Sequence, residues 1–224
     1  MNIHGFSFRG VSLHALPSGA LHWPEERLLV VSDLHLGKSA RLSAVGGAQL
    51  PPYDTQETLS RLEQDLAATR ARSVICLGDS FDAPGIDACL PEPEALWIAR
   101  LQAGRDWTWI EGNHDPGPVA LGGTHRAEHR LGPLVFRHIA SPGAEGEVSG
   151  HYHPKARIVA RGRALTHPCF LCDARRLILP AYGAYTGGLY CDRAPLATLM
   201  GPEARAILLA RRPVAIPMPR AAAG

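Results

Sequence analysis

The sequence has no long hydrophobic run, little excess of charge of either sign and few lysines. None of its 224 residues lies in a stretch approaching the ~20 apolar residues of a membrane-spanning helix, so no membrane association is expected. The formal net charge of +2 is too small to predict nucleic-acid binding by itself. Of the 23 basic residues, only Lys38 and Lys155 are lysines. Arginine suits bidentate phosphate contacts, although a general preference for arginine codons gives the same composition.

The chain also lacks a recognisable secretion signal and a disulfide framework. Its first residues, MNIHGFSFRGVSLH, have neither the positive start nor the unbroken apolar region of a signal peptide. Five cysteines are an odd number without framework spacing, so we expect a cytoplasmic protein with reduced thiols. Cys169 and Cys172 have C-x-x-C spacing, but residues three apart on a strand face opposite ways, which favours packing over a zinc or redox site.

The composition, 46% hydrophobic and 20% charged, is typical of a globular protein. No linker rich in Ser, Gly or Pro divides the chain, and we predict a single domain over residues 1–224. Within it we expect a β-rich part from about residue 155 and a loosely held tail over 213–224.

Hydrophobic periodicity predicts alternating helices and strands in the first half of the chain. We expect short strands within residues 6–31, a loop over 39–53, helices over about 55–70 and 92–103, and strands over 73–77 and 107–111. Asp54, with Glu57 three residues later, is the expected N-cap of the first helix. A strand, a helix and a strand in succession predict parallel pairing. Beyond residue 131 the pattern is strand-rich, so we predict an α/β fold of two sheets packed face to face with helices outside.

Five short apolar segments each end at a side chain that can bind a metal ion. They are LLVVS before Asp33-Leu34-His35, SVICLG before Asp79, WTWIEG before Asn113-His114, LVFR before His138, and VSG before His151-Tyr152-His153. A buried strand ending in Asp, Asn or His places the ligand at the rim of a sheet, where open α/β folds hold their sites. Metal ligands are therefore expected at Asp33, His35, Asp79, Asn113, His138, His151 and His153.

Spacing within these segments predicts paired ligands. On extended backbone, residues i and i+2 point to the same side, so Asp33 and His35 are expected to share an ion, as are His151 and His153. Glycines precede three ligands, at points where close backbone approach would be needed: Gly78, Gly112 and Gly150. Nitrogen and oxygen ligands without thiolate suit Mn²⁺, Fe or Zn²⁺, and we expect two divalent ions, with Mn²⁺ favoured.

A site of this kind predicts phosphoester hydrolysis. Two ions about 3.5–4 Å apart lower the pKa of a shared water towards ~7 and hold the oxygens of a phosphoryl group. We expect the metal-bridging hydroxide to attack phosphorus in line, and His114 to protonate the departing oxygen as general acid. Asp82 follows Asp79 by three residues and is expected to accept the other ring N–H of His114, which would orient the ring.

The motifs D-x-H, G-D-x-x-D, G-N-H-D, a strand-terminal His and G-H-x-H, in this order, resemble those of the calcineurin-like metallophosphoesterases. The segments DLHLGK, GHYHP, PCF and LPAYGAYTGG further resemble the bacterial ligase-associated DNA-damage-response endonucleases. The resemblance implies a four-layer αββα sandwich of two mixed sheets with flanking helices and a metal site at the carboxyl ends of strands.

By position, the resemblance assigns Asp33, His35, Asp79 and His153 to one metal, and Asp79, Asn113, His138 and His151 to the other. It also implies DNA as substrate and, as partners, a DNA ligase and a helicase of a repair group. The chain departs from the resemblance at Asp82, because related DNA nucleases often carry His there, whereas phosphatases and other phosphodiesterases often carry Asp.

Three basic residues are candidates for binding the substrate. Lys38 lies close to the first ligand pair, while Lys155 and Arg157 share parity after His153 and could lead a phosphate backbone away from the site. A solvated strand edge explains Lys155 and Arg157 equally well. The stretch from Tyr182 to Tyr185 could stack against bases or could pack on the core as a strand bend.

The leading hypothesis is a metal-dependent phosphodiesterase that acts on DNA as a repair endonuclease. A phosphatase or a small-nucleotide phosphodiesterase is the alternative, favoured by Asp82 and the modest net charge. A scaffold without catalysis is disfavoured because every ligand position is filled. The sequence makes no prediction of oligomeric state.

Overall fold

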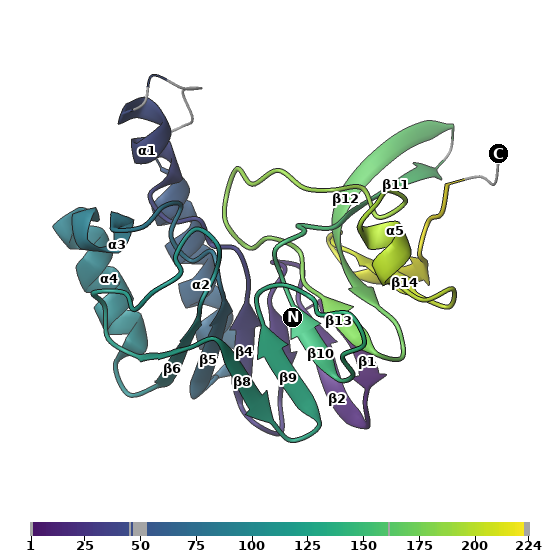
Figure 1. The fold of residues 1–224 in the computed structure, drawn as a ribbon, viewed down its shortest axis with the longest axis horizontal. Coiled ribbons are helices and arrows are strands. Elements are labelled where there is room, and N and C mark those ends of the chain that lie inside the picture. Colours follow the sequence, from purple (N-terminus) through teal and green to yellow (C-terminus); the bar gives the residue numbers. More distant parts are fainter. Residues whose placement is uncertain (1, 45, 47–52, 161, 222–224) are drawn as a thin grey trace.

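Two β-sheets face each other in the computed structural model, which describes residues 2–44, 46, 53–160 and 162–221 (Figure 1). Within these residues the first sheet has seven strands, in the order β1 to β7. They are β1 (His4–Phe8), β2 (Val11–Ala15), β3 (Leu21–Trp23), β4 (Leu28–Val31), β5 (Ser73–Leu77), β6 (Asp106–Ile110) and β7 (Thr124–Arg126). Neighbours pair antiparallel from β1 to β4 and parallel from β4 to β7.

The second sheet holds the strand-rich end of the chain. Its strands are β8 (Glu128–Leu131), β9 (Leu134–Arg137), β10 (Glu147–Ser149), β12 (Arg163–Cys172), β13 (Arg176–Ile178), β14 (Arg205–Leu208) and β15 (Val214–Pro217), with β11 (Lys155–Ala160) paired to β12. β10 runs parallel to β9 and β13, and the other pairs are antiparallel. Both sheets are therefore mixed, and the hairpin of β11 with the start of β12 projects from the body (Figure 1).

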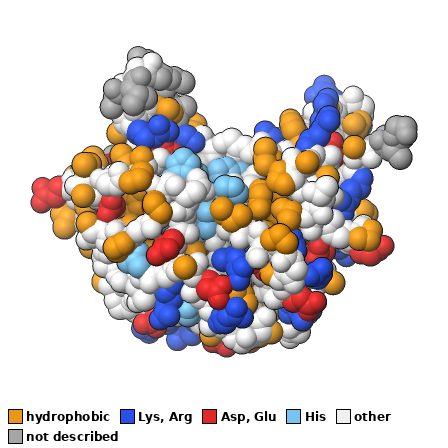
Figure 2. All heavy atoms as spheres, in the orientation of Figure 1, with side chains coloured by type: hydrophobic (Ala, Val, Ile, Leu, Met, Phe, Trp, Pro, Cys, Tyr) orange, Lys and Arg blue, Asp and Glu red, His pale blue; other side chains and the backbone are white. Residues whose placement is uncertain are grey.

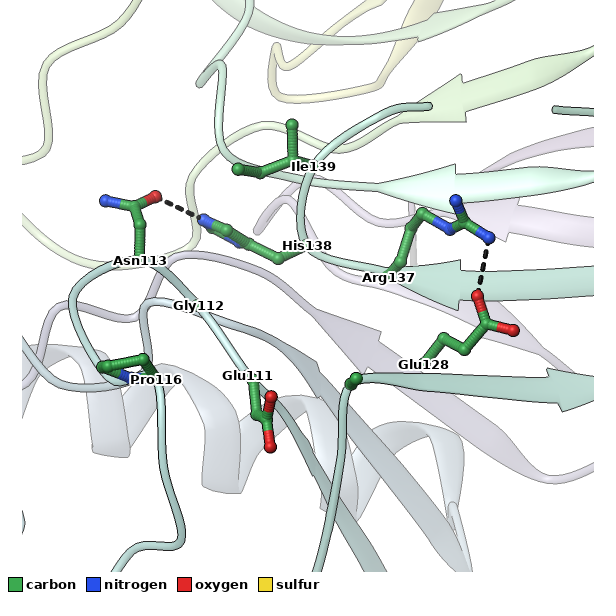
Figure 3. A pocket seen from close by; sticks show the side chains of 9 residues that line it. Glu111, Gly112, Asn113, Pro116, Glu128, Arg137, His138 and Ile139 are labelled. Atoms are coloured by element: carbon green, nitrogen blue, oxygen red, sulfur yellow. Dashed lines mark hydrogen bonds and ion pairs between the residues drawn. The ribbon is translucent and has the colours of Figure 1, made fainter. Parts of the chain in front are cut away.

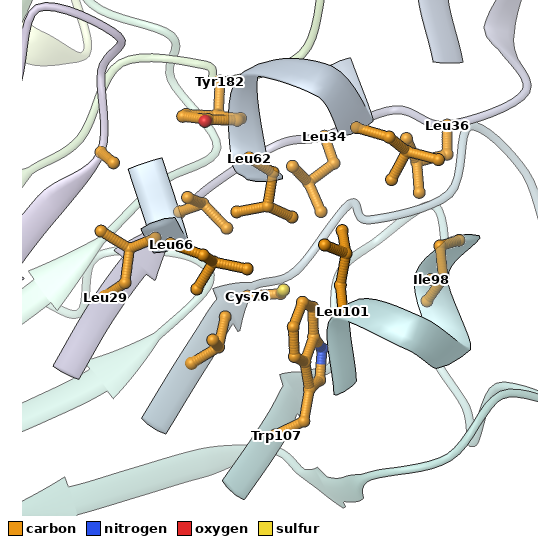
Figure 4. Close-up of a cluster of buried hydrophobic side chains, with 14 of the residues drawn as sticks. Leu29, Leu34, Leu36, Leu62, Leu66, Cys76, Ile98, Leu101, Trp107 and Tyr182 are labelled. Carbon is orange, nitrogen blue, oxygen red and sulfur yellow. The ribbon is translucent and has the colours of Figure 1, made fainter. Parts of the chain in front are cut away.

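Two helices cover the outer face of the first sheet. α2 (Asp54–Thr69) and α4 (Glu92–Gln102) confirm the two predicted helices. The apolar cluster between helices and sheet includes Leu29, Leu62, Leu66, Cys76, Ile98, Leu101 and Trp107 (Figure 4). Each fully buried leucine or isoleucine side chain contributes about 1.5–3 kcal/mol, so this cluster fixes the helices against the parallel strands.

Two further apolar clusters complete the layers. The space between the sheets is filled from both sides, for example by Val30 and Ile75 of the first sheet and by Phe136 and Phe170 of the second. On the outside of the second sheet, Leu196 of α5 (Leu196–Leu199) packs in a third cluster with residues of β12, β13 and β14. The predicted four-layer αββα sandwich is thus confirmed, with one short helix in its last layer.

The structure differs from the predicted loop over residues 39–53. Lys38–Ala44 form α1, while residues 45 and 47–52 lie outside the described part of the chain. Tyr53, not Asp54, occupies the N-cap position of α2. The Asp54 carboxylate instead accepts hydrogen bonds from Ser39, at 3.0 Å from its backbone nitrogen and 2.5 Å from its hydroxyl. This contact joins α1 to α2 and helps to fix residues 38–44 as a helix where we predict the start of a loop.

The end of the chain differs from the loose tail expected over 213–224. β15 pairs with β14, and Met218 is only 5% exposed. Arg220 donates hydrogen bonds to carbonyl groups at the end of α5, including that of Ala197 at 2.8 Å. Residues 222–224 lie outside the described part.

The cysteine pair of the C-x-x-C segment has the predicted arrangement. Cys169 packs in the outer cluster and Cys172 against the cluster between the sheets, so the two thiols lie on opposite faces of β12. All five cysteines are free. Among the helices of the described residues, none combines the length and apolarity needed to cross a membrane.

Candidate metal centre

The strand ends bring two groups of ligand atoms together. Asp33, His35 and His153 form the first group, Asp79, His138 and His151 form the second, and within each group the ligand atoms lie within 4.8 Å of one another. His35 also lies within this distance of ligand atoms of Asp82 and His114. Asn113 joins the second group, because its Oδ1 lies 3.0 Å from His138 Nε2 (Figure 3). All seven predicted ligands therefore converge. Figure 2 shows histidine side chains gathered in a hollow between α1 and the β11–β12 hairpin.

The pairing of the last two histidines differs from the prediction based on spacing and agrees with the assignment based on resemblance. His151 belongs to the second group and His153 to the first, so they do not share an ion site. Their backbone is not extended, with φ of 70° at His151 and 46° at His153. Asp33, His35 and Asp79 also have positive φ, between 45° and 54°. Left-handed backbone at non-glycine residues is strained and is maintained by its surroundings, which is common at functional sites.

Glycines allow the ligand loops to approach one another, as the sequence predicts. A methyl group at Gly112 would overlap the backbone nitrogen and the carboxylate of Asp79, and one at Gly150 would overlap the hydroxyl of Ser32. Gly78 has a φ of +76°, and a methyl group there would lie 2.7 Å from the His138 ring. Only hydrogen fits at these points.

Asp33 lies at the base of the first group, with no exposed surface. Its carboxylate accepts hydrogen bonds from the Ser32 hydroxyl at 2.5 Å and the His151 backbone nitrogen at 3.0 Å, and lies 3.1 Å from His153 Nε2. Burial raises the pKa of Asp33, but the hydrogen bond and charge of His153, together with His138 and Ser32, lower it below its ordinary value. The side chain is therefore an anion at neutral pH.

Asp79 holds the corresponding place in the second group. Its Oδ1 accepts the His114 backbone N–H at 2.9 Å, and its Oδ2 lies 3.3 Å from His138 Nε2. Burial raises the pKa of Asp79, but the hydrogen bond and charge of His138 and the contacts with His114 lower it to about 2. Among the described residues its oxygens group with His138 and His151. That Asp79 also binds the ion of the first group, and so bridges two ions, stays a prediction.

The donor atoms around His138 fit a bound cation. Its Nδ1 donates to the carbonyl of Leu77 at 2.7 Å, which leaves Nε2 as a lone-pair donor in the neutral ring. That nitrogen lies 3.0 Å from Asn113 Oδ1, 3.1 Å from His151 Nδ1 and 3.3 Å from Asp79 Oδ2. Lone pairs that converge so closely need positive charge between them, which a proton on His138 or a metal ion supplies.

The first group contains an unpaired buried nitrogen. His35 is 6% exposed, and its Nε2 has no hydrogen-bond partner within the described structure. Its Nδ1 lies 3.0 Å from Asp82 Oδ1. Burying a polar atom without a partner is costly, and a metal ion held with Asp33 and His153 would satisfy it.

The orientation of Asp82 corrects one prediction. Its carboxylate faces His35 and accepts a hydrogen bond from Arg41 of α1 at 2.5 Å. The carbonyl oxygen of Asp82, not the carboxylate, lies 2.9 Å from Nδ1 of His114. The sequence gives no signal for Arg41, because its position depends on α1 packing beside the site.

Replacing Asp82 with Asn is therefore expected to weaken metal binding through His35. Loss of a group that orients a metal ligand typically costs about 10–100-fold in metal affinity or activity. The expected result is a shift of that size in the Mn²⁺ concentration that gives half-maximal turnover. Asp106→Asn, at the exposed start of β6, is the matched control. Equal Mn²⁺ dependence in both variants would contradict this role.

His114 lies beside both groups and is accessible to solvent. Its side chain is 40% exposed, and its Nε2 lies 4.0 Å from Asp79 Oδ2. The ring makes an edge contact with that of His35, with centroids 5.2 Å apart. Since the Asp82 carbonyl accepts at Nδ1, the free Nε2 is the atom that can carry a proton to a substrate.

Asp115 is a structural residue of the site that we do not predict from the sequence. It is 8% exposed, and its two oxygens accept hydrogen bonds from the backbone nitrogens of Asp79, Ser80, Phe81 and Gly112. Burial and the neighbouring Asp79 raise its pKa to about 6, although the hydrogen bonds oppose this shift. The position within G-N-H-D was the only available signal.

The LPAYGAYTGG segment supports the ligand loops from behind. The backbone nitrogens of Tyr182 and Gly183 donate to the carbonyl groups of Ser32 and Asp33, at 2.8 and 3.1 Å. Tyr182 is fully buried and donates its hydroxyl hydrogen to Asp65 at 2.9 Å, so it belongs to the core. Tyr185 is 47% exposed. Of the two readings of this stretch, packing applies to Tyr182, whereas Tyr185 is free to contact a ligand.

The three basic residues expected to bind substrate are dispersed. Lys38 is the first residue of α1 and is half-buried. Lys155 lies two residues after His153 on β11, with its ammonium group 4.7 Å from the centre of the Tyr190 ring. Arg157 is exposed on the same face of β11. Substrate contact by these residues stays a prediction.

Comparisons with known proteins agree with this geometry. Residues 26–165 match the model of the calcineurin-like phosphoesterase family. The crystal structure of Pseudomonas putida nuclease MPE is similar, with a TM-score of 0.72 and 29% identity over 95% of this chain and 100% of that chain. The E. coli phosphoesterase Yfce is far more distant, with a TM-score of 0.41 and 11% identity over 86% of this chain and 99% of that chain. No curated protein matches the chain.

Proposed function

Because the chain belongs to the calcineurin-like phosphoesterase family, we propose that it is a metal-dependent phosphodiesterase that cleaves DNA, as an endonuclease in DNA repair. The observation that carries the proposal is the convergence of two adjacent donor groups, each with one buried carboxylate and two histidines. Divalent ions bound there, Mn²⁺ in the first place and Fe or Zn²⁺ otherwise, would supply an activated water and neutralise charge on the phosphoryl group.

The protein itself contributes positioning and proton transfer in this proposal. Asp33 and Asp79 hold fixed negative charge at the base of the two groups, and Asn113 completes the second. His114 delivers the proton from Nε2 to the departing oxygen while the Asp82 carbonyl holds Nδ1. General acids of this kind contribute about 10²–10⁴-fold to rate, most for leaving groups that are poor without protonation.

Similarity to a nuclease over nearly the whole chain supports a nucleic-acid substrate, and the resemblance to DNA endonucleases is the reason for proposing DNA. Arg157 and Lys155, beside the exposed Tyr190, offer charge and a ring face next to His153. Lys38, the first residue of α1, is proposed to contact the substrate from that helix. Asp82, the residue that favours the phosphatase alternative, is 2% exposed and paired with Arg41, so its carboxylate is not proposed to contact the substrate.

The same proposal extends to the cellular setting. Free cysteines suit the reducing cytoplasm, where a repair nuclease would work. A DNA ligase and a helicase are proposed as partners on the resemblance alone. Residues 1–224 are proposed to fold as a single domain, because the cluster between the sheets draws side chains from both.

A substrate panel tests the proposal. With Mn²⁺ present, we expect cleavage of internal bonds in DNA and turnover of bis(p-nitrophenyl) phosphate, little turnover of p-nitrophenyl phosphate, and none after chelation. Preferred turnover of the monoester would establish the phosphatase alternative. Unchanged turnover in chelator would remove the metal from the mechanism.

His114→Gln is the companion variant for this panel. DNA cleavage should fall by about 10²–10⁴-fold, because its leaving alkoxide needs a proton. Cleavage of the aryl ester should fall far less, because p-nitrophenolate leaves without one. Equal losses on both substrates would show that His114 is not the general acid.

A further inference from the structure

A cavity of about 500 Å³ opens beside the second donor group. Asn113 and His138 form its inner wall, so a ligand in the cavity lies next to the metal centre (Figure 3). Its volume lies in the range of about 300–1,000 Å³ that is usual for small-molecule sites. Neither His114 nor His35 lines it.

The other walls combine apolar surface with a few polar groups. Ile139 is 44% exposed, and Pro116 and Ala127 are exposed beside it. Glu111 is exposed and makes no ion pair within the described structure. A flat ring could lie on the apolar surface while the Glu111 carboxylate accepts hydrogen bonds from its N–H or O–H groups.

The charge of the cavity disfavours binding of a phosphate group other than the one that is cleaved. Arg137 is the only Lys or Arg among the described lining residues, and the charge at His138 faces the metal centre. Arg137 already forms an ion pair with Glu128, with Nη2 at 2.6 Å (Figure 3), and its Nε lies 3.5 Å from the buried Glu147 carboxylate, so its charge is largely compensated. Because Glu111 adds a free negative charge, the cavity suits a neutral group rich in hydrogen-bond donors, such as a nucleoside, rather than a further nucleotide phosphate.

The position of His114 decides which part of the substrate lies in the cavity. In an in-line displacement the leaving group departs towards the acid, which here is His114 beside His35. The substituent that stays on phosphorus points elsewhere. The cavity borders Asn113 and His138 but not the acid. It is therefore positioned to hold the substituent that remains bonded to phosphorus.

We propose that this cavity binds the nucleoside on the non-leaving side of the scissile phosphodiester, with Glu111 as a residue that determines specificity. The proposal rests on the phosphodiesterase function and adds a substrate subsite to it. Binding in a preformed cavity stabilises ground state and transition state alike, so the subsite acts mainly on KM.

Two esters with the same leaving group test this subsite. One is the p-nitrophenyl ester of thymidine monophosphate, and the other is methyl p-nitrophenyl phosphate, which has nothing to place in the cavity. With Mn²⁺, the wild-type kcat/KM should be at least about tenfold higher for the thymidine ester, since even a methylene in an apolar pocket is worth about tenfold or more.

Variants of the lining residues test whether the preference for the thymidine ester arises from the cavity. Ala127→Phe fills it and should bring the ratio of the two kcat/KM values close to one. Glu111→Gln should lower the ratio by roughly three- to tenfold, the value of one hydrogen bond. Glu203→Gln, exposed in the segment before β14, should keep the wild-type ratio. Because each ratio is measured within one preparation, a partly unfolded sample does not change it.

The outcomes separate the subsite from the function. Failure of the wild type to hydrolyse either ester or DNA with any divalent metal would overturn the phosphodiesterase proposal itself. Metal-dependent hydrolysis with equal kcat/KM for both esters would overturn the subsite alone. A preference that Ala127→Phe leaves intact would show that the nucleoside binds outside this cavity.

Discussion

Replacing Asp79 with Asn is expected to lower metal-dependent turnover by on the order of 10³-fold or more, because several kcal/mol of charge stabilisation are lost and each 1.36 kcal/mol is tenfold in rate. Asp79 is the carboxylate of the second donor group and carries its negative charge. An asparagine oxygen can still accept the His114 backbone N–H, so its amide nitrogen would take the place of the oxygen 3.3 Å from His138. A carboxylate oxygen that can bind a metal ion is thus replaced by an amide N–H donor that cannot, and the site loses a negative charge.

The measurement is turnover of bis(p-nitrophenyl) phosphate with Mn²⁺, together with the metal content of the purified protein. Asp106→Asn has the same change in charge at the far end of β6 and serves as the control. A similar metal content and turnover in Asp79→Asn and Asp106→Asn would show that the second group does not bind a catalytic metal.

Replacing Asp115 with Asn is expected to destabilise the protein by about 3 kcal/mol, because two buried N–H donors lose their acceptor at about 1–3 kcal/mol each. One carboxylate oxygen accepts from Asp79 and Gly112, at 2.9 and 3.0 Å, and the other from Ser80 and Phe81, at 2.7 and 3.3 Å. Whichever oxygen becomes an amide nitrogen then faces two N–H groups. Either rotamer leaves one pair unpaired.

Thermal and urea unfolding of the metal-free protein measure this effect. A loss of about 3 kcal/mol corresponds to a decrease of about 6–12 °C in Tm for a protein of this size. Metal-free protein is the appropriate form, because a bound metal would add its own stabilisation. If Asp115→Asn unfolds at the same temperature as Asp106→Asn, the Asp115 carboxylate does not hold the two loops together.

Local sequence accounts for the strands and for the two main helices. Leu59, Leu62 and Leu66 recur at helical spacing and become the buried face of α2. The apolar run at residues 28–31 becomes β4, which is buried along its whole length. The sequence does not predict α1, because KSARLSA has no apolar stripe. The helix is held by the contact of Ser39 with Asp54 of α2, which is a tertiary contact.

The sequence alone determined which residues reach the site. Apolar runs make buried strands, parallel strands bring their carboxyl ends to one edge, and a polar residue that follows such a strand must therefore lie at that edge. This reasoning explains why Asp33, Asp79 and Asn113 lie at one edge of the first sheet, and why His138 and His151 lie at one edge of the second. The packing of the two sheets then brings these edges together.

Tertiary structure decided how those residues are shared and oriented. Left-handed backbone separates His151 from His153, since one faces Asp79 and the other Asp33. The packing of α1 brings Arg41 to the Asp82 carboxylate, which then faces His35 and not His114. The approach of two loops lets Asp115 accept hydrogen bonds from backbone nitrogens such as that of Asp79. These outcomes depend on contacts between segments far apart in the chain, where a rotation of one or two backbone angles redirects a side chain. Spacing along the sequence does not encode such rotations.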